Sequence, residues 1–241
     1  VNWCPKSQTA LSDEEVFFKE VEGKLWYIKY QVEGADTFIE IATTRPETML
    51  GDTAIAVNPE DKRFKNLIGK KAILPLVNKT IPIISDKMVD PDFGTGCVKI
   101  TPAHDPNDYN VGKKHNLQML NIMNPDGSIN SNAPKQYIGL TREDARKKII
   151  NDLNAEDYLL KEEDYMHKVG YSERGDVPIE YYLSNQWFLK MKELAKPASD
   201  VVKSGEIKFY PNHWVKTYNH WMDNIQDWCI SRQLYWGHRI P

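Results

Sequence analysis

The chain has 241 residues, of which 41% are hydrophobic and 27% are charged, and its formal net charge is −3. This composition is typical of a folded globular protein and excludes both a disordered chain and a strongly basic nucleic-acid-binding protein. No run approaches the roughly 18 apolar residues of a membrane span, and no export signal is visible, so we expect no membrane partner. Because the chain begins at Val1 and stops at Pro241 without a closing signal, we expect a piece of a longer protein.

A β-hairpin is the first element that the sequence predicts. Residues 24–32 and 37–43 are rich in β-branched and aromatic side chains, and they flank a turn at residues 33–36. Further short runs bounded by Pro, Gly, Asn and Asp predict strands at residues 53–57, 72–76, 80–84, 96–101 and 117–122. The middle of the chain is therefore expected to be a β-rich domain of the α/β class.

Helices are expected after these strands. Residues 141–144 have the form of a capping box, and apolar residues follow at i, i+4 and i+8: Ala145, Ile149 and Leu153. Strand signals return between residues 168 and 188. A C-terminal helical segment is then indicated by tryptophans spaced by seven, seven and eight: Trp214, Trp221, Trp228 and Trp236. We expect this stripe to be buried in the core or between domains.

The pattern divides the chain into three parts. Residues 1–35 form a lead-in segment, residues 36–167 the central domain, and residues 168–241 the exit strands with the tryptophan-rich segment. Residues 4–7 and 172–175 have the outline of paired C-x-x-C knuckles, but only Cys4 is a cysteine. Since a closed zinc site needs four ligands, we expect a ribbon without metal. The three distant cysteines exclude a disulfide framework and indicate a reducing compartment, the cytoplasm.

A threonine-rich turn is the first candidate for chemistry. Residues 43–53 read TTRPETMLGDT, and Pro46 prevents the preceding strand from continuing. Hydroxyls and backbone N–H groups in such a turn can surround an anionic or carbonyl oxygen. The alternative is a tight connection whose threonines only satisfy backbone groups.

A second candidate spans residues 94–109, GTGCVKITPAHDPNDY. If residues 96–101 form a strand, Val98 and Ile100 face the core, while Cys97, Lys99 and Thr101 share the opposite face. A cation and a hydroxyl then lie together at the end of a strand.

The acidic residues after this strand predict the start of a helix. Asp105 has the position of an N-cap, Pro106 the first helical position, and Asp108 lies in the first turn. The alternative is that both carboxylates only stabilise the helix N-terminus. His104 could act as a general base or pair with the Cys97 thiol, although a turn separates the two residues. No glycine-rich phosphate loop is present.

Several long motifs together resemble the inserted editing domain of class I aminoacyl-tRNA synthetases, most closely that of the valine enzymes. The resemblance rests on TTRPETMLGDTAIAVNPED, GTGCVKITPAHDPNDYNVGKKHNL, LSNQWFLKM and DWCISRQLYWGHRIP, and it covers essentially the whole chain. It implies a short-stranded, barrel-like sheet with flanking helices. The ATP-site signatures of that family, of the H-x-G-H and K-M-S-K-S types, are absent from these residues.

The resemblance also implies an activity and partners. The activity is hydrolysis of threonine wrongly esterified to the valine tRNA, and the partners are the 3′ acceptor end of that tRNA, its threonyl ester and the rest of the synthetase in cis. No cofactor is implied. Carried over by motif position, the catalytic candidates are Lys99, Thr101, Asp105 and Asp108. The candidates for binding the substrate and the tRNA end are Thr43, Thr44, Arg45, Glu47, Thr48 and His104.

Two other functions stay open at this point. The same fold could edit for the isoleucine or leucine enzymes, although the GDTAIAVNP and HDPNDYNVG stretches favour valine. The chain could also be a non-catalytic module that only binds the acceptor end. Phosphates could be contacted by basic runs at residues 62–65, 70–71, 113–114 and 146–148, although each run alone is more often a solvated surface.

Overall fold

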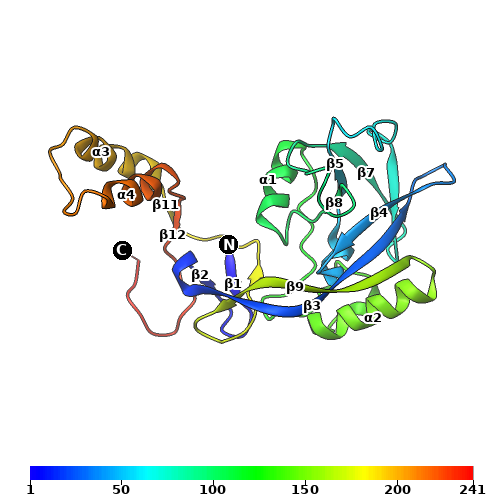
Figure 1. Cartoon of the computed structure of the whole chain (residues 1–241). Helices are drawn as coiled ribbons and strands as arrows, with labels where there is room; N and C mark the ends of the chain where they lie inside the picture. Colours follow the sequence, from blue (N-terminus) through cyan, green and yellow to red (C-terminus); the bar gives the residue numbers. More distant parts are fainter. Residues whose placement is uncertain (241) are drawn as a thin grey trace.

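The computed structural model describes residues 1–240 as a mixed α/β protein rich in short strands, which confirms the predicted class (Figure 1). The helices are α1 (Pro106–Lys114), α2 (Arg142–Ala155), α3 (Met191–Lys203) and α4 (Trp214–Asp223), with the 3-10 helices η1 (Asp13–Glu15), η2 (Pro46–Gly51) and η3 (Lys135–Tyr137). The strands are β1 (Asn2–Cys4), β2 (Thr9–Leu11), β3 (Val16–Gln31), β4 (Phe38–Thr43), β5 (Ala54–Val57), β6 (Lys71–Leu74), β7 (Lys79–Ser85), β8 (Cys97–Ile100), β9 (Leu159–Ser172), β10 (Glu180–Tyr181), β11 (Phe188–Leu189) and β12 (Trp228–Cys229).

The predicted hairpin is confirmed as β3 and β4, which pair antiparallel with Trp26 opposite Thr43. The next four predicted strands are confirmed within a few residues as β5 to β8. The strand predicted at residues 117–122 is wrong, because this segment has no regular secondary structure and belongs to no ladder. Its apolar character reflects burial: Ile122 is fully buried, and its backbone N–H donates to Nε2 of His104 at 3.1 Å.

Two sheets surround the core of the central part of the chain. One has the order β4-β3-β9 and the other the order β6-β7-β5-β8, in which only β5 and β7 are parallel. A bridge between Val32 and Ala72 joins the two sheets on one side, and β4 contacts β8 on the other. Within residues 1–240 no ladder joins β4 to β8, so the barrel-like arrangement is open.

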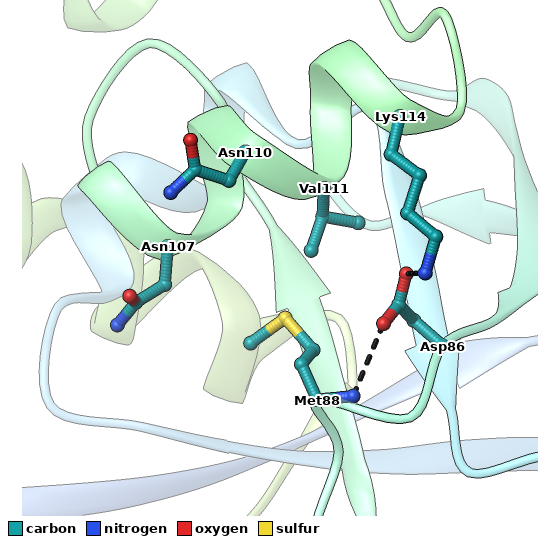
Figure 2. Close-up of a pocket in the computed structure, with 6 residues that line it drawn as sticks. All are labelled: Asp86, Met88, Asn107, Asn110, Val111 and Lys114. Carbon is teal, nitrogen blue, oxygen red and sulfur yellow. Dashed lines mark hydrogen bonds and ion pairs between the residues drawn. The ribbon is translucent and has the colours of Figure 1, made fainter.

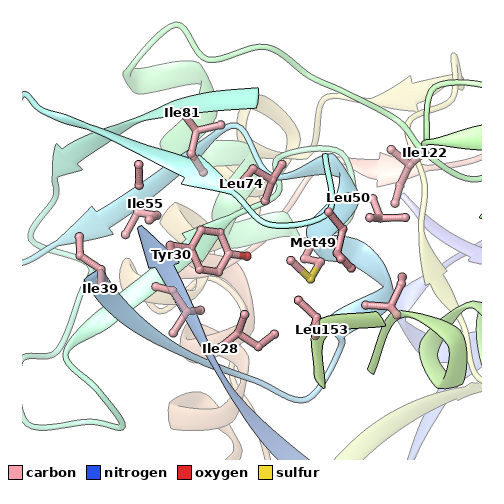
Figure 3. Close-up of a cluster of buried hydrophobic side chains, with 14 of the residues drawn as sticks. Ile28, Tyr30, Ile39, Met49, Leu50, Ile55, Leu74, Ile81, Ile122 and Leu153 are labelled. Carbon is pink, nitrogen blue, oxygen red and sulfur yellow. The ribbon is translucent and has the colours of Figure 1, made fainter. Parts of the chain in front are cut away.

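Apolar side chains from both sheets meet in one buried cluster (Figure 3). The cluster includes Ile28 and Tyr30 of β3, Met49 of η2 and Ile55 of β5. Helix α2 covers it with Ala145, Ile149 and Leu153, all fully buried, and Thr141 caps the helix by accepting from the backbone N–H of Asp144 at 3.1 Å. The N-cap and the apolar spacing of this helix are thus confirmed, whereas the reciprocal bond of a full capping box is not formed within the described residues: the Asp144 carboxylate accepts from the Thr141 hydroxyl at 2.8 Å.

A long two-stranded ribbon connects the central part with the remaining elements. Strands β3 and β9 pair from Val16 opposite Ser172 to Ile28 opposite Leu159, and they run along the lower edge of the molecule in Figure 1. At one end lies the small sheet β10-β1-β2. Helices α3 and α4 form a separate lobe beyond it (Figure 1).

The four tryptophans of the stripe are exposed: two lie on α4, one on β12 and one in the segment that follows. The relative exposures are 50%, 65%, 51% and 90% for Trp214, Trp221, Trp228 and Trp236. Burial of the stripe in the core of this chain is therefore wrong. Helix α4 buries none of its residues, which leaves Trp214 and Trp221 exposed, and it ends at Asp223, so the later tryptophans lie beyond the helix. Their burial against another domain stays a prediction.

None of the helices in residues 1–240 combines the length and the apolar character that crossing a bilayer requires.

Candidate active site

Strand β8 places the first two candidate residues. It pairs antiparallel with β5, with Lys99 opposite Ile55. Val98 and Ile100 pack in an apolar cluster on one side of the strand, while Cys97 belongs to the main core cluster on the other. Lys99 and Thr101 are buried on the side of Cys97, and the predicted alternation is confirmed.

Lys99 is the centre of a buried hydrogen-bond network. Its ammonium donates to Thr48 Oγ1 at 2.9 Å, to Thr101 Oγ1 at 2.6 Å and to Asp52 Oδ1 at 3.2 Å. An ammonium has three protons, so these three acceptors use all of its donors. Lys99 therefore holds the two threonine hydroxyls in place and supplies a positive charge.

Asp52 is a member of this network that the sequence analysis missed. Its Oδ1 also accepts from Thr101 Oγ1 at 2.5 Å, and its Oδ2 accepts from the Tyr30 hydroxyl at 2.8 Å. Burial raises the pKa of Asp52, although Lys99 and the two hydroxyls act in the opposite direction. The residue stands inside the threonine-rich motif, but only the pairing of β5 with β8 reveals its partner 47 positions further along the chain.

Close packing holds the turn that carries Asp52. Gly51 lies directly against the segment before Ile122, and a Cβ added there would come within 3.1 Å of the Leu120 carbonyl oxygen. A larger residue at this position would force the turn and the segment at Leu120–Ile122 apart by a few tenths of an ångström.

Helix α1 carries the two acidic candidates. Asp105 caps the helix, and its Oδ1 accepts from the backbone N–H groups of Asn107 and Asp108 at 2.7 and 3.1 Å. Pro106 is the first helical residue, as predicted. Asp108 turns back toward β8, where its Oδ2 accepts from the Thr101 backbone N–H at 2.8 Å.

Asp108 is a buried carboxylate with one oxygen to spare. In residues 1–240 no hydrogen bond reaches its Oδ1. Burial raises the pKa of Asp108 to about 7, and the nearby carboxylates Asp105 and Asp52 add to the effect. Lys99 and the Thr101 N–H lower the pKa of Asp108 without cancelling the rise. The free oxygen is a strong acceptor for a donor that enters the site.

The threonine-rich turn is closed by its own side chains. Thr43 Oγ1 accepts from the Arg45 N–H at 3.0 Å, and Thr48 Oγ1 donates to the Arg45 carbonyl oxygen at 2.9 Å. The structure thus joins Thr48 both to this turn and to Lys99. Thr44 is half-buried beside them.

An ion-pair network fixes the Arg45 side chain. Its guanidinium donates to Glu47 at 3.1 Å and to Glu180 of β10 at 2.5 Å. Glu47 also accepts from Arg146 of α2 at 2.8 Å, and Glu180 from Arg142 at 2.6 Å. Three elements, η2, α2 and β10, are therefore tied together beside the site, and nothing in the sequence spacing indicates the partners on α2 and β10.

Burial alone would raise the pKa of Glu47. The hydrogen bonds from Arg146 and the charges of Arg45 and Arg146 outweigh this effect and lower the pKa to about 2. Glu47 is therefore ionised at neutral pH, and its contacts are with these two arginines.

His104 and Cys97 are buried and lie in different surroundings. Burial, together with the charge of Arg45, lowers the pKa of His104 to about 4, so the imidazole is neutral. Because its Nε2 accepts from Ile122, its Nδ1 carries the proton, and that buried atom has no partner in the described part of the chain. Burial raises the pKa of Cys97 to about 12, which leaves almost no thiolate at neutral pH.

The four positions of the degenerate knuckles come together. Cys4 Sγ lies 3.4 Å from Ser7 Oγ, and a Cβ added to Gly175 would lie 3.1 Å from Cys4 Sγ. Ser172 is fully buried and pairs with the first residue of β3. Across residues 1–240 no group of three or more His, Cys, Asp or Glu is arranged to hold a metal ion. The metal-free ribbon stays a prediction.

A cavity of about 460 Å³ lies on the outer flank of α1 (Figure 2). Asn107, Asn110 and Val111 project into it from the helix, and Asp86 lies opposite. Asp86 accepts from Lys114 at 2.8 Å and from His115 at 2.9 Å, so its buried carboxylate fastens the C-terminal end of the helix. Asp108, one residue after Asn107, faces β8 instead.

Comparison with known proteins gives the family. A family model described as class I tRNA synthetases (I, L, M and V) matches residues 1–241. The chain belongs to this family. It is 60% identical over its whole length to a valine–tRNA ligase of Clostridium tetani and 58% identical to one of Thermotoga maritima. It spans only 27% and 28% of those two proteins.

One solved structure is similar at lower identity. It is the ternary complex of Agrobacterium radiobacter K84 agnB2 LeuRS with tRNA and LeuAMS, at 23% identity and a TM-score of 0.46. The match covers 64% of this chain and 21% of that one. The predicted resemblance to class I synthetases is confirmed by the family match, which spans the motifs on which it rested.

Proposed function

We propose that this synthetase segment hydrolyses the ester bond that joins a wrongly attached threonine to the valine tRNA. The observation that carries the proposal is the buried Asp108, with a free carboxylate oxygen beside Thr101, Lys99 and the threonine-rich turn. The high identity to proteins named valine–tRNA ligase supports valine as the amino acid of the parent enzyme.

Physical chemistry explains why such a site is needed. Valine and threonine have nearly the same shape, and an apolar pocket rejects the added hydroxyl by only about 100-fold. A site that hydrogen-bonds the hydroxyl discriminates more strongly, because valine would leave a buried polar group without a partner. Asp108 has the required burial and the required free acceptor.

Each candidate residue then has a proposed role. Asp108 accepts from the threonine hydroxyl, and Asp105, at the N-terminus of α1, faces the substrate ammonium. The protons of Lys99 are all engaged, and the hydroxyl protons of Thr48 and Thr101 are donated to Arg45 and Asp52. Lys99 therefore acts on the ester through its charge, which stabilises the negative charge that develops on the ester oxygen.

The remaining candidates surround the end of the tRNA. Thr43, Thr44 and the backbone at Arg45 and Glu47 form the wall that receives the terminal ribose and adenine. Within the described residues the Nδ1–H of His104 is unpaired but buried, so it becomes a further donor when the bound tRNA end displaces the side chains that cover it. An aminoacyl ester is already activated, so a positioned water suffices as nucleophile and no cofactor is required.

The proposal extends to partners and place of action. The 3′ acceptor end of the valine tRNA is the substrate, the rest of the ligase acts in cis, and the cytoplasm is where both are found. The exposed tryptophans of the C-terminal lobe are the surface expected to pack against that remainder.

A panel of charged tRNAs tests the function. We expect the chain to hydrolyse threonine from the valine tRNA and to leave the correctly charged valine tRNA intact. Preferential hydrolysis of a mischarged isoleucine or leucine tRNA would assign the site to one of those enzymes instead. Binding of the charged tRNA without any hydrolysis would identify a non-catalytic module.

A further inference from the structure

We propose that Asp52 is a positioning residue of this site, an inference that rests on the proposed ester hydrolysis. Asp52 is fully buried, so it cannot touch a substrate itself. One of its carboxylate oxygens receives both the Lys99 ammonium and the Thr101 hydroxyl, at 3.2 and 2.5 Å. It therefore fixes two candidate residues at once.

The orientation of Thr101 depends on this contact. The Thr101 hydroxyl donates to Asp52 and accepts from Lys99, which leaves it a single arrangement. The backbone N–H of the same residue donates to Asp108. A continuous chain of contacts thus runs from Asp52 through Thr101 to the carboxylate proposed to read the substrate hydroxyl.

Tyr30 anchors the other side of Asp52. Its hydroxyl donates to Asp52 Oδ2 at 2.8 Å, and its ring is fully buried in the core cluster (Figure 3). Both carboxylate oxygens therefore have fixed partners on separate strands, β3 and β8. The core of the domain holds Asp52, and Asp52 holds Lys99 and Thr101.

The alternative is that Asp52 only balances the charge of Lys99. The chain offers a matched control for this: Asp86 is also buried and also pairs with a lysine, Lys114, but on the far flank of α1. The variants Asp52→Asn and Asp86→Asn each remove one buried carboxylate charge at constant size. Both lose stability, so a difference in hydrolysis between them reports on position and not on folding.

Steady-state hydrolysis and its dependence on substrate concentration are the first test. We expect Asp52→Asn to lower kcat by about 10- to 100-fold with KM nearly unchanged, because small displacements of reacting groups cost rates of this size. Asp86→Asn should keep the kcat of the parent chain. Equal kcat values for the two variants would overturn the proposal.

Tyr30→Phe provides a milder change if Asp52→Asn does not fold. It removes one hydrogen bond to Asp52 and leaves the contacts with Lys99 and Thr101 in place. The loss of one such bond predicts a kcat lowered by about 2- to 10-fold. A parental kcat in this variant would argue that the fixing of Asp52 has no effect on the reaction.

A measurement without substrate separates this proposal from the proposed function. Hydrogen exchange of the Thr101 amide reports whether its bond to Asp108 persists. We expect the Thr101 amide to exchange about 10-fold or more faster in Asp52→Asn than in Asp86→Asn. The reason is that weakening its hydrogen bond to Asp108 lowers its protection by about the free energy of one hydrogen bond. Equal rates overturn the positioning role, whereas a chain that hydrolyses no ester but shows the difference in exchange overturns only the function.

Discussion

At the scale of single residues, Asp108 combines two properties that oppose each other. A helix N-terminus and the Thr101 N–H favour its charged form, whereas burial favours the neutral form and raises its pKa to about 7. Such a raised pKa is typical of functional carboxylates, because a structural ion pair would lower it. Glu47, which is also buried, shows the opposite case.

Asp108→Asn should change how stability depends on pH. The unfolded chain releases the Asp108 proton near its usual pKa of 3.8, whereas the folded chain keeps it to about pH 7. The free energy of unfolding therefore falls as the pH rises between these values and is constant above them. We expect the free energy of unfolding of the variant not to fall in this range. Relative to that of the parent chain, it should therefore rise by up to about 3 kcal/mol between about pH 5 and pH 8. Urea unfolding of both chains at these two pH values measures the difference between their free energies of unfolding. A difference that is the same at both pH values would contradict the prediction.

Cys97→Ala should leave ester hydrolysis intact. With a pKa of about 12, the thiol is protonated at neutral pH and cannot act as a nucleophile. Loss of its sulfur from the core should cost about 1 kcal/mol in the free energy of unfolding. Hydrolysis rates of parent and variant are the measurement, and a loss on the order of 1,000-fold would indicate covalent catalysis.

At the scale of elements, the Arg45–Glu47–Arg146 network connects η2 to α2, and Glu180 extends it to β10. Each carboxylate is buried, and each is shared by two guanidinium groups. The network thus holds the threonine-rich turn against the helix that covers the core.

Glu47→Gln should destabilise the chain at neutral pH. The folded-state pKa of about 2 lies below the usual 4.5, so Glu47 contributes stability above pH 4.5 that is lost as the pH falls through about 2. The shift corresponds to roughly 3 kcal/mol. In thermal unfolding at neutral pH, the parent chain should melt at a higher temperature than the variant. This gap in melting temperature should be smaller at about pH 3. The exposed Glu60→Gln is the control, and a gap that does not change with pH would contradict the prediction.

Local signals in the sequence were sufficient for most elements near the site. The Thr141 cap of α2, the Asp105-Pro106 start of α1 and the alternation in β8 depend on neighbouring residues only, and all are confirmed. The contacts of Asp52 and Glu47 could not be predicted this way. They depend on which strands and helices meet, and the partners stand 47 and 99 positions away in the chain.

The errors have the same physical origin. Residues 117–122 have the apolar composition of a strand, yet their backbone meets a histidine side chain and a loop instead of a ladder. The tryptophan spacing indicates packing but does not say against what, and within residues 1–240 these side chains meet solvent. The composition of a segment predicts whether its side chains tend to be buried better than it predicts which part of the molecule packs against them.

At the scale of the whole molecule, charge decides how an RNA could be held. The net charge is −3, and several basic side chains are already paired, among them Arg146 with Glu47 and Lys114 with Asp86. Lys70 and Lys71 are exposed, and within the described residues neither forms an ion pair. Any phosphate contacts should therefore be few and should come from such lysines.

Binding of the tRNA should weaken with salt at a shallow slope. Each phosphate neutralised on a single strand contributes about 0.7 to the slope of log affinity against log salt. Replacing Lys70 and Lys71 together by alanine should reduce the slope by up to about 1.4. Replacing Lys196, which is exposed on α3 and paired with Asp200, should leave it unchanged. A salt-independent affinity of the parent chain would contradict this account.

The central claim is that Asp108 reads the substrate hydroxyl, and single-turnover hydrolysis of threonyl-charged valine tRNA tests it most directly. Asp108→Ala removes a charge-assisted hydrogen bond of about 1.5–3 kcal/mol, so we expect hydrolysis about 10- to 150-fold slower than in the parent chain. The Asp86→Asn variant, which loses a buried carboxylate charge elsewhere, should keep the parental rate. Hydrolysis at the parental rate by folded Asp108→Ala would contradict the claim.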